Sequence, residues 1–334
     1  MAALSPRIVS LIPSATEIVA VLGWGDRLVG RSHECDYPLA VQSLPICTAP
    51  KFNPTGDSAA IHQRVTDLLQ SALAVYAVNT ELLAQLQPTH IVTQAQCEVC
   101  AVSLSDVEQA VAELTEVKPT IVSLQPAVLS DVWQDMLTVG EAIAGSAGKQ
   151  QAESAIAVLK QRVNGCIARV ETVAQERPTV ACIEWIDPLM AAGNWVPELV
   201  ELAGGISCFG TIGQHSPWIT WEALIEADPE IIVVMPCGYT LAQTRAELST
   251  LMGHPGWQQL NAVQNNRVYV VDGNQYFNRP GPRLVDSLEI LAEIFYGEQT
   301  PYRYQSQGWQ LIPNPQCDRT CGGSGMGRSL TDVR

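Results

Sequence analysis

Cysteine and histidine side chains form the most distinctive chemical pattern in this sequence of 334 residues. Cys97 and Cys100 have the C-x-x-C spacing that suits two thiolate ligands of one metal ion. A four-ligand site needs partners from other loops, and Cys35, His33 and Cys237 are the candidates. A single C-x-x-C pair also fits packed reduced thiols or a redox-active disulfide. The pattern therefore leaves a metal or iron–sulfur site and a plain thiol role open.

Aromatic side chains gather in the segments that follow the predicted strands. Seven of them stand there or close by: Tyr37, Trp185, Trp195, Trp218, Tyr239, Tyr276 and Phe277. Aromatic rings supply a large contact area at a low cost in conformational entropy. Each ring alone could equally belong to a core or its rim, but the set favours a site for a large, flat ligand.

Several classes of function are disfavoured by composition. The net charge of −15 argues against binding to nucleic acid or to an anionic membrane surface. No apolar run reaches the ~18 residues that a membrane span needs. The five histidines are scattered, and no nucleophile–base pair or phosphate-binding loop is visible. We therefore expect a binding protein without catalytic activity of its own.

The elements that must position these residues alternate between strand and helix. Short apolar runs predict strands at 7–11, 28–31, 90–93, 120–124, 180–184, 231–235 and 268–271. Helical patterns lie between them at 15–22, 58–72, 81–87, 106–114, 131–144, 197–203, 221–227, 241–251 and 283–296. This alternation predicts an α/β protein of two Rossmann-like lobes with mainly parallel sheets.

A weak internal repeat supports two lobes. Glu81 and Glu222 each open a helix that ends seven residues later at a proline, and each proline precedes an apolar strand and a loop with a cysteine. Ligands of open α/β sheets bind beyond the carboxyl ends of the strands. Two facing lobes would therefore place these loops on both walls of one cleft.

One long amphipathic stretch separates the two halves. Between 149 and 176, apolar residues recur at steps of three and four: Ala152, Ile156, Leu159, Val163, Cys166, Ile167, Val170 and Ala174. At ~1.5 Å per residue the helix would run roughly 40 Å. We predict a rigid strut, with an N-terminal lobe at 1–126, connecting helices at 127–177, a C-terminal lobe at 178–312 and a flexible tail with glycine and cysteine at 313–334.

The sequence also resembles a known family, the cobalamin-binding substrate-binding proteins of ABC importers. These receptors are also called helical-backbone metal receptors, because one rigid helix joins their two lobes. The resemblance covers about 7 to 296 and is carried by five motifs: RIVSLIPSATE (7–17), RSHECDYP (31–38), TQAQCEVCA (93–101), EWIDP (184–188) and PCG (236–238).

The resemblance implies a cobalamin-like corrinoid, a vitamin B12-type ligand, held between the lobes. Carried over to this sequence, its contacts are Ser32, His33, Tyr37, Gln96, Trp185, Trp195, Trp218, Tyr239, Tyr276, Phe277 and Arg279. Relatives in the family bind haem or ferric siderophores, so these ligands are the alternatives. His33 or a cleft cysteine could also ligate the metal of a corrinoid or haem directly.

The resemblance further implies a partner, the permease of an ABC transporter. One glutamate on each lobe would dock on it, and Glu81 and Glu222 match those positions; as first-turn residues they also suit the helix dipole. The start of the sequence, Met1 to Arg7, shows no signal-peptide pattern, so we expect a cytoplasmic protein with reduced thiols, or a periplasmic one if the start codon is misassigned. A cytoplasmic thiol–metal or redox protein on the same fold is the alternative function.

Overall fold

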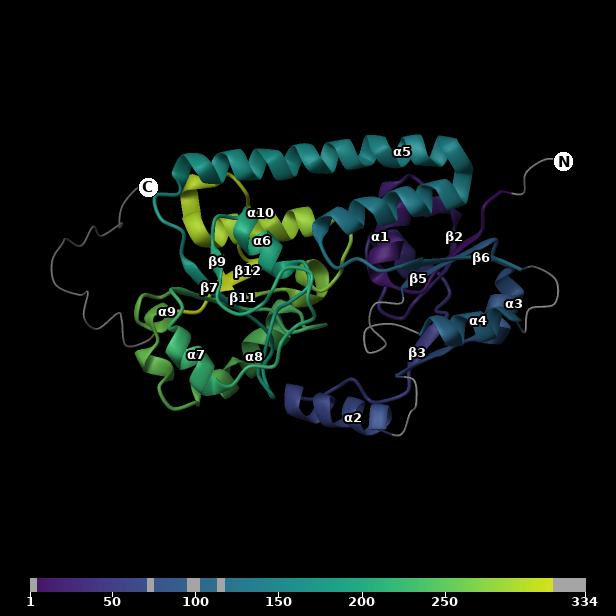
Figure 1. The fold of residues 1–334 in the computed structure, drawn as a ribbon. Helices are drawn as coiled ribbons and strands as arrows, with labels where there is room; N and C mark the ends of the chain where they lie inside the picture. The colour runs from purple at the N-terminus through teal and green to yellow at the C-terminus, as the bar shows by residue number, and fades with distance from the viewer. Residues whose placement is uncertain (1–4, 71–74, 95–102, 113–117, 315–334) are drawn as a thin grey trace, which may run out of the picture.

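The computed structural model describes residues 5–70, 75–94, 103–112 and 118–314 (Figure 1). Its first part contains β1 (Ile8–Ser10), α1 (Pro13–Val21), β2 (Leu28–Arg31), β3 (Thr48–Pro50), α2 (Ser58–Gln70), β4 (Tyr76–Val78), α3 (Thr80–Leu86), β5 (His90–Gln94), α4 (Leu104–Ala112) and β6 (Thr120–Leu124). The rest contains α5 (Leu129–Val173), β7 (Thr179–Trp185), β8 (Met190–Ala191), α6 (Val196–Leu202), β9 (Ile206–Ser207), α7 (Trp221–Ala227), β10 (Ile231–Val234), α8 (Leu241–Met252), α9 (Asn261–Gln264), β11 (Val268–Val271), α10 (Leu284–Tyr296) and β12 (Trp309–Leu311).

Two separate sheets form the centres of two lobes. The first sheet has the order β2-β1-β5-β6 and all its neighbours are parallel. The second has the order β12-β11-β10-β7-β8, with β9 also paired to β7. Its strands β7, β10 and β11 are parallel, whereas β8 and β12 are antiparallel additions at the edges. The predicted α/β class with two mainly parallel sheets is therefore confirmed, and we call the two units the N-terminal and C-terminal lobes.

A long helix joins the lobes, as the amphipathic stretch predicts. Backbone angles leave the helical region at Ala144 and Gly145, so α5 consists of two helices that fold back on each other (Figure 1). The second of these, the strut, extends from about residue 146 to Val173. Most of its predicted apolar stripe is buried: Ala152, Ile156, Leu159, Val163, Cys166 and Val170.

The hairpin within α5 depends on glycine at the point where its two helices touch. A Cβ added at Gly148 would lie 2.0 Å from the carbonyl oxygen of Gly140, and one added at Gly140 would lie 2.5 Å from that of Gly148. Only residues without a side chain allow this approach. Gly145 has a φ of 58°, a left-handed conformation that glycine adopts without strain, at the turn itself.

The strut is fixed to both lobes by polar contacts as well as by its buried face. Gln151 donates a hydrogen bond to the carbonyl of Leu22, directly after α1. Arg162 forms ion pairs with Asp286 at 2.5 Å and Glu289 at 2.6 Å, both on α10. One buried apolar cluster contains residues of α1, α5 and α10 together with strands of both sheets. The two lobes thus share a continuous core beside the strut.

The internal repeat of the sequence is also a repeat of structure. Asn79 accepts a hydrogen bond from the N–H of Leu82 and so caps α3, and Thr220 caps α7 in the same way through Ala223. Both helices end at a residue in the left-handed conformation, Gln87 and Asp228. Each is followed by a central parallel strand, β5 or β10.

Candidate functional site

The segments that follow the parallel strands of the two sheets meet between the lobes. The segment after β2 carries Asp36, and the segment after β11 carries Arg279, and these two side chains form an ion pair at 2.5 Å. Such segments at the carboxyl ends of strands are the usual place for a ligand in an open α/β sheet. The candidate site is therefore built from these loops.

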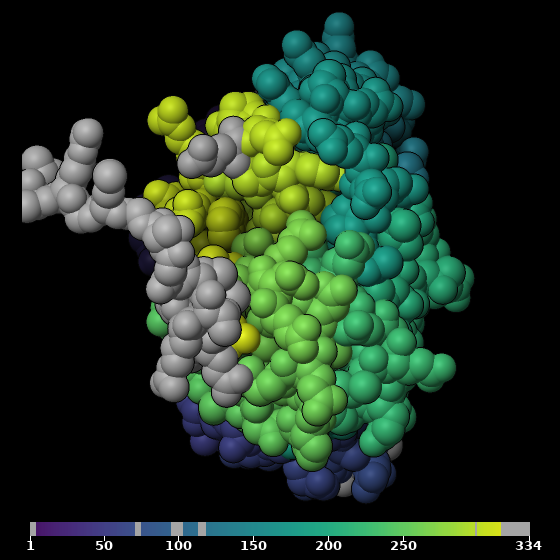
Figure 2. All heavy atoms as spheres, turned by 90° about the vertical axis from the view of Figure 1, so that its left-hand side faces the viewer, coloured from purple at the N-terminus to yellow at the C-terminus, as the bar shows by residue number. Residues whose placement is uncertain are grey.

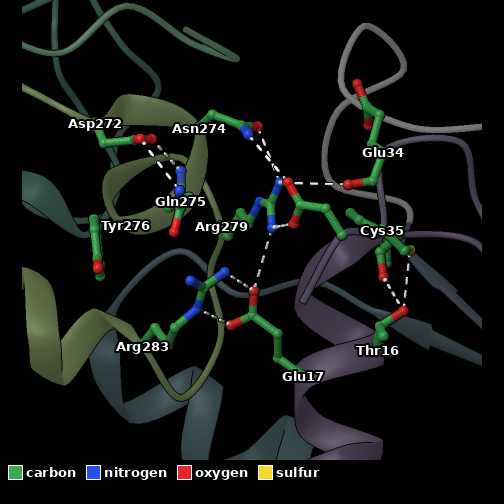
Figure 3. A network of polar contacts seen from close by, with 12 residues as sticks. Thr16, Glu17, Glu34, Cys35, Asp272, Asn274, Gln275, Tyr276, Arg279 and Arg283 are labelled. Carbon is green, nitrogen blue, oxygen red and sulfur yellow. Dashed lines mark hydrogen bonds and ion pairs between the residues drawn. The ribbon is translucent and has the colours of Figure 1, made fainter. Parts of the chain in front are cut away.

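Four charged residues, which we call the root cluster, connect the lobes next to the strut: Glu17, Asp36, Arg279 and Arg283. Glu17, Arg279 and Arg283 are labelled in Figure 3. Arg283 donates two hydrogen bonds to the carboxylate of Glu17, at 2.9 and 2.5 Å, in a bidentate pair. Arg279 bonds both carboxylate oxygens of Asp36 and lies 3.6 Å from Glu17. Glu17 is 1% exposed, so the centre of this cluster is fully removed from water.

In the root cluster, each ion pair offsets part of the free-energy cost of removing its two charged groups from water. Burial raises the pKa of Glu17, and the guanidinium groups of Arg283 and Arg279 oppose that rise by stabilising its carboxylate. Burial alone would raise the pKa of Asp36, but the bond with Arg279 lowers it below its usual value. Removal of one member would leave a charge without a partner in the core.

The root cluster changes the interpretation of three predicted ligand contacts. Arg279 is 4% exposed and its guanidinium is occupied by Asp36, Asn274 and the carbonyl of Glu34, so it holds the loops together. Tyr37 is 46% exposed, and its ring lies 4.1 Å from the guanidinium carbon of Arg283. Tyr276 lies at 5.6 Å from the same group. Of these three, only Tyr37 offers a large exposed surface.

The loop after β2 is held by its own side chains. The Ser32 hydroxyl accepts a hydrogen bond from the N–H of Glu34 and lies 3.5 Å from the sulfur of Cys35. The Nδ1 atom of His33 bonds the hydroxyl of Thr48 at 2.8 Å. Burial, and then the nearby Arg31, lower the pKa of His33, so its imidazole is neutral at pH 7.

Glu34 in the same loop is a half-buried residue whose carboxyl group is largely removed from water. Burial raises its pKa to about 7, although Arg279 acts in the opposite direction and Asp36 adds to the rise. In Figure 3 its backbone carbonyl accepts a hydrogen bond from Arg279, while its carboxyl group points away from the root cluster. This loop therefore carries a group that changes its charge near neutral pH.

Aromatic residues of the C-terminal lobe form the other part of the site. Trp185, at the end of β7, packs edge-on against Tyr239 with ring centroids 5.7 Å apart. The indole N–H of Trp185 is buried and has no hydrogen-bond acceptor among the residues that the structure describes. Trp218 is 56% exposed and contacts the ring of His62, from the N-terminal lobe, at 5.3 Å.

Three predicted aromatic contacts are buried in the C-terminal lobe, and the first of them is Tyr239, which is 6% exposed. Trp195 is 7% exposed and donates its indole hydrogen to the carbonyl of Phe277 at 2.8 Å. Phe277 is fully buried. Trp195 and Phe277 both belong to the shared core, so neither presents surface to a ligand in this structure.

The predicted cysteine site is not assembled by the described residues. Cys97 and Cys100, together with the predicted contact Gln96, lie outside them. Within residues 5–70, 75–94, 103–112 and 118–314, no three His, Cys, Asp or Glu side chains are grouped to hold a metal ion. Cys35 is 1% exposed, burial raises the pKa of its thiol, and Thr16 bonds its sulfur at 3.0 Å. The fourth candidate, Cys237, is half-buried, and its N–H bonds the carbonyl of Glu184.

A cavity of about 390 Å³ opens at the other edge of the second sheet. Its lining includes Pro178, Glu230 and Arg267, which precede β7, β10 and β11. It therefore lies at the amino ends of these strands, away from the candidate site. Among the described helices, none is long and apolar enough to cross a membrane.

Sequence reasoning missed Glu17, Asp36 and Arg283. A usable signal existed, because Glu17 is the single charged residue of helix α1, where it is buried. The spacing of Arg279 and Arg283, four residues apart, also marks two cations that can act together. Their partners lie more than 240 positions away in the sequence, and no local pattern connects them.

Known proteins resemble this chain over most of its length. It is 26% identical to an uncharacterized ABC transporter substrate-binding lipoprotein, YvrC, of Bacillus subtilis, over 87% of this chain and 80% of that protein. It is 26% identical to a vitamin B12-binding protein of Vibrio cholerae, over 85% of this chain and 86% of the other. The structure of the periplasmic heme-binding protein RhuT from Roseiflexus sp. RS-1 has the same fold, with a TM-score of 0.66 and 22% identity over 88% of this chain and 99% of RhuT.

These comparisons overturn the expectation of a cytoplasmic protein. That expectation rested on the first seven residues alone, whereas YvrC is named as a substrate-binding lipoprotein and RhuT as a periplasmic heme-binding protein. They point to a place outside the cytoplasm. The model of the family described as "Periplasmic binding protein" matches residues 8–274. The chain therefore belongs to the periplasmic binding protein family, the non-enzymatic substrate-binding proteins of ABC transporters.

Proposed function

We propose that this protein binds a cobalamin-like corrinoid between its lobes and delivers it to an ABC importer. The observation that carries the proposal is the set of aromatic rings that both lobes contribute near the candidate site. Tyr37 comes from the N-terminal lobe, and Trp185, Trp218 and Tyr239 from the C-terminal lobe. Tyr37 and Trp218 are exposed and Trp185 is half-buried, whereas Tyr239 is 6% exposed and packs against Trp185. The exposed rings suit a large, flat ligand, and the buried N–H of Trp185 offers a hydrogen-bond donor for a polar group on it. The similarity to a vitamin B12-binding protein supports the choice of ligand.

A titration with cyanocobalamin tests this proposal directly. The purified protein should bind one equivalent, with quenching of tryptophan fluorescence and a higher melting temperature. Trp185→Ala should weaken binding at least tenfold, because it removes both a ring and the free donor. Trp24→Phe is the matched control, since Trp24 packs on the core away from the site and should leave affinity unchanged. Absence of any heat, spectral change or thermal shift with cobalamins would refute the proposal.

A haem receptor is the second candidate, and His33 is the observation that favours it. Thr48 occupies the Nδ1 atom of His33, which fixes the ring and makes Nε2 the nitrogen available to a metal. A neutral imidazole is the form that ligates iron or cobalt. Titration with haemin separates the two ligands: a Soret band that shifts in the wild type and not in His33→Ala would favour haem.

Docking on the transporter is the second part of the proposal. Glu81 and Glu222 are exposed in the first turns of α3 and α7, helices with the same caps at both ends. Two equivalent carboxylates, one on each lobe, suit a partner that presents a cation to each lobe. Glu81→Arg combined with Glu222→Arg should abolish cyanocobalamin uptake by cells that depend on this receptor, without changing affinity in solution. Glu226→Arg, also exposed on α7, is the control; an equal loss of uptake in that variant would argue against specific docking.

A further inference from the structure

Helix α2 contacts both lobes: Arg64 donates hydrogen bonds to the carbonyls of Asn53 and Thr55 in its own lobe, and the first turn of α2 contacts the opposite lobe. It belongs to the N-terminal lobe by sequence, between β3 and β4. Ser58, its first residue, is its only buried residue. Ile61, Val65 and Leu68 remain partly exposed, and Leu69 is 44% exposed. An amphipathic helix normally buries its apolar side in the core of its own unit. Because α2 does so only in part, polar and aromatic contacts must also hold it.

The contacts of α2 with the C-terminal lobe are specific. The N–H and the hydroxyl of Ser58 both donate to Oε1 of Glu247 on α8, the N–H at 2.7 Å. The same hydroxyl accepts a hydrogen bond from the N–H of Asp187, after β7, at 3.0 Å. One turn later, His62 packs edge-on against Trp218. Three separate segments of the C-terminal lobe therefore hold the first turn of α2.

The position of α2 places these contacts at the side of the molecule away from the strut. Figure 1 shows α5 along one edge of the molecule and α2 along the opposite edge, reaching under the C-terminal lobe. In Figure 2 the dark-blue atoms of the N-terminal lobe lie beneath the green C-terminal lobe, again opposite the teal helix. The root cluster joins the lobes beside the strut, and α2 joins them at the far edge.

We infer that α2 is a latch over the candidate ligand site, which must leave Glu247 and Trp218 before a ligand can pass. This inference rests on the proposed function for the identity of the ligand. A continuous strut and a shared core resist wide rotation of the lobes, so release of one helix is the smaller movement. The latch packs His62 against one side of Trp218, an aromatic residue of the proposed site that is 56% exposed, and its release frees the rest of that ring.

The caps of α2 allow it to leave without losing its helical form. Glu247 places a carboxylate at the N-terminus of α2, where it complements the helix dipole. Asp57 caps the same end from within the N-terminal lobe, because its side chain accepts a hydrogen bond from the N–H of Ala60 at 2.8 Å. When Glu247 is released, Asp57 remains, and the helix stays capped.

Hydrogen exchange of the ligand-free protein tests the latch without any ligand. Glu247→Ala should speed exchange of the α2 amides at least tenfold and leave those of β5 and β10 unchanged. Gln63→Ala is the control, since Gln63 is exposed on α2 and bonds only Asp67 of the same helix. Unchanged exchange of α2 in Glu247→Ala, or equal acceleration in β5 and β10, would overturn the inference.

Stopped-flow mixing with cyanocobalamin tests whether the latch controls passage. Glu247→Ala and His62→Ala should raise both the association and the dissociation rate at least fivefold, with less than a threefold change in Kd. A variant that raises only the dissociation rate would identify a ligand contact instead, and the latch would be refuted. If the wild type binds no cobalamin, the proposed function fails, and the exchange measurement alone then decides whether α2 releases.

Discussion

The root cluster and the latch both connect the two lobes, but their surroundings are opposite. Glu17, Arg279 and Arg283 are at most 8% exposed and lie beside a core that both lobes share. In the latch, Ser58 is buried, while the helix that carries it is largely open to solvent. A buried ion pair is expensive to break, whereas a helix held mainly by its first turn can come away locally. The molecule is therefore stiff beside the strut and able to open at the far edge.

The largest expected effect comes from the centre of the root cluster. Glu17→Gln removes the carboxylate that pairs with Arg283 and leaves that guanidinium charged in the core. The free energy of unfolding should fall by about 3–5 kcal/mol, the usual cost of breaking a buried pair. Urea unfolding followed by tryptophan fluorescence measures it. Glu171→Gln, an exposed position on the strut, should change stability by less than about 0.5 kcal/mol. A loss below 1 kcal/mol in Glu17→Gln would remove the contrast between the two regions.

The pH dependence of stability should reveal Glu34, beside the root cluster. Because its pKa is about 7 in the folded protein and about 4.5 when unfolded, the folded state binds more protons between these values. Stability therefore falls as pH rises from about 4.5 to about 7.5, by about 3 kcal/mol if the full shift applies. Glu34→Gln should remove this part of the slope.

Asp135, in the first helix of α5, also contributes to the pH dependence of stability. Burial and the neighbouring Asp131 raise its pKa to about 7 as well, so it contributes a slope of the same sign. The comparison should be made in Asp135→Asn protein, with and without Glu34→Gln. If the two titration curves coincide, Glu34 is not a buried titrating group.

Sequence patterns predicted the elements of this fold better than their contacts. The stripe from Ala152 to Val170 repeats at helical steps, and a helix face is a local property, so its burial could be foreseen. The equivalent helices α3 and α7 were predicted for the same reason. The end of the first helix of α5 at 144 was predicted too. That the two helices fold back on each other was not, because this depends on Gly140 and Gly148 meeting across a turn.

The candidate site was less predictable than the fold. Trp195 and Phe277 lie beyond the ends of strands and Trp185 ends one, yet the chain turns Trp195 and Phe277 into the core and leaves Trp185 partly exposed. Position after a strand gives the edge of the sheet on which a residue lies, but not the direction of its side chain. The latch was equally invisible, since the pattern at 58–72 predicts a helix and says nothing of the lobe that receives it.

The glycine pair of α5 gives a prediction of intermediate size. Gly148→Ala forces a methyl group against the backbone of Gly140, and the helices must separate; a loss of about 1–3 kcal/mol follows. Gly165→Ala on the same strut is the matched control, because no atom lies within 4 Å of its added Cβ. That variant should gain up to about 1 kcal/mol from helix propensity. Thermal unfolding of both would check the sign; stabilisation by both would mean that the hairpin is not tightly packed.

The smallest expected effect is that of Ser58→Ala in the latch. The variant loses the hydroxyl contacts with Glu247 and Asp187. Once the variant has lost as much free energy as docks α2, this helix undocks while the core stays folded. The loss in the free energy of global unfolding therefore has the docking free energy of α2 as its upper limit. We expect less than about 1 kcal/mol by urea unfolding, although a hydrogen bond to a charged group can be worth about 1.5–3 kcal/mol. Ser154→Ala, whose hydroxyl bonds only the carbonyl of Gln150, is the control. A loss of 3 kcal/mol or more would show that α2 is held as firmly as the root cluster. Both edges of the molecule would then be rigid, and the contrast between the two regions would be lost.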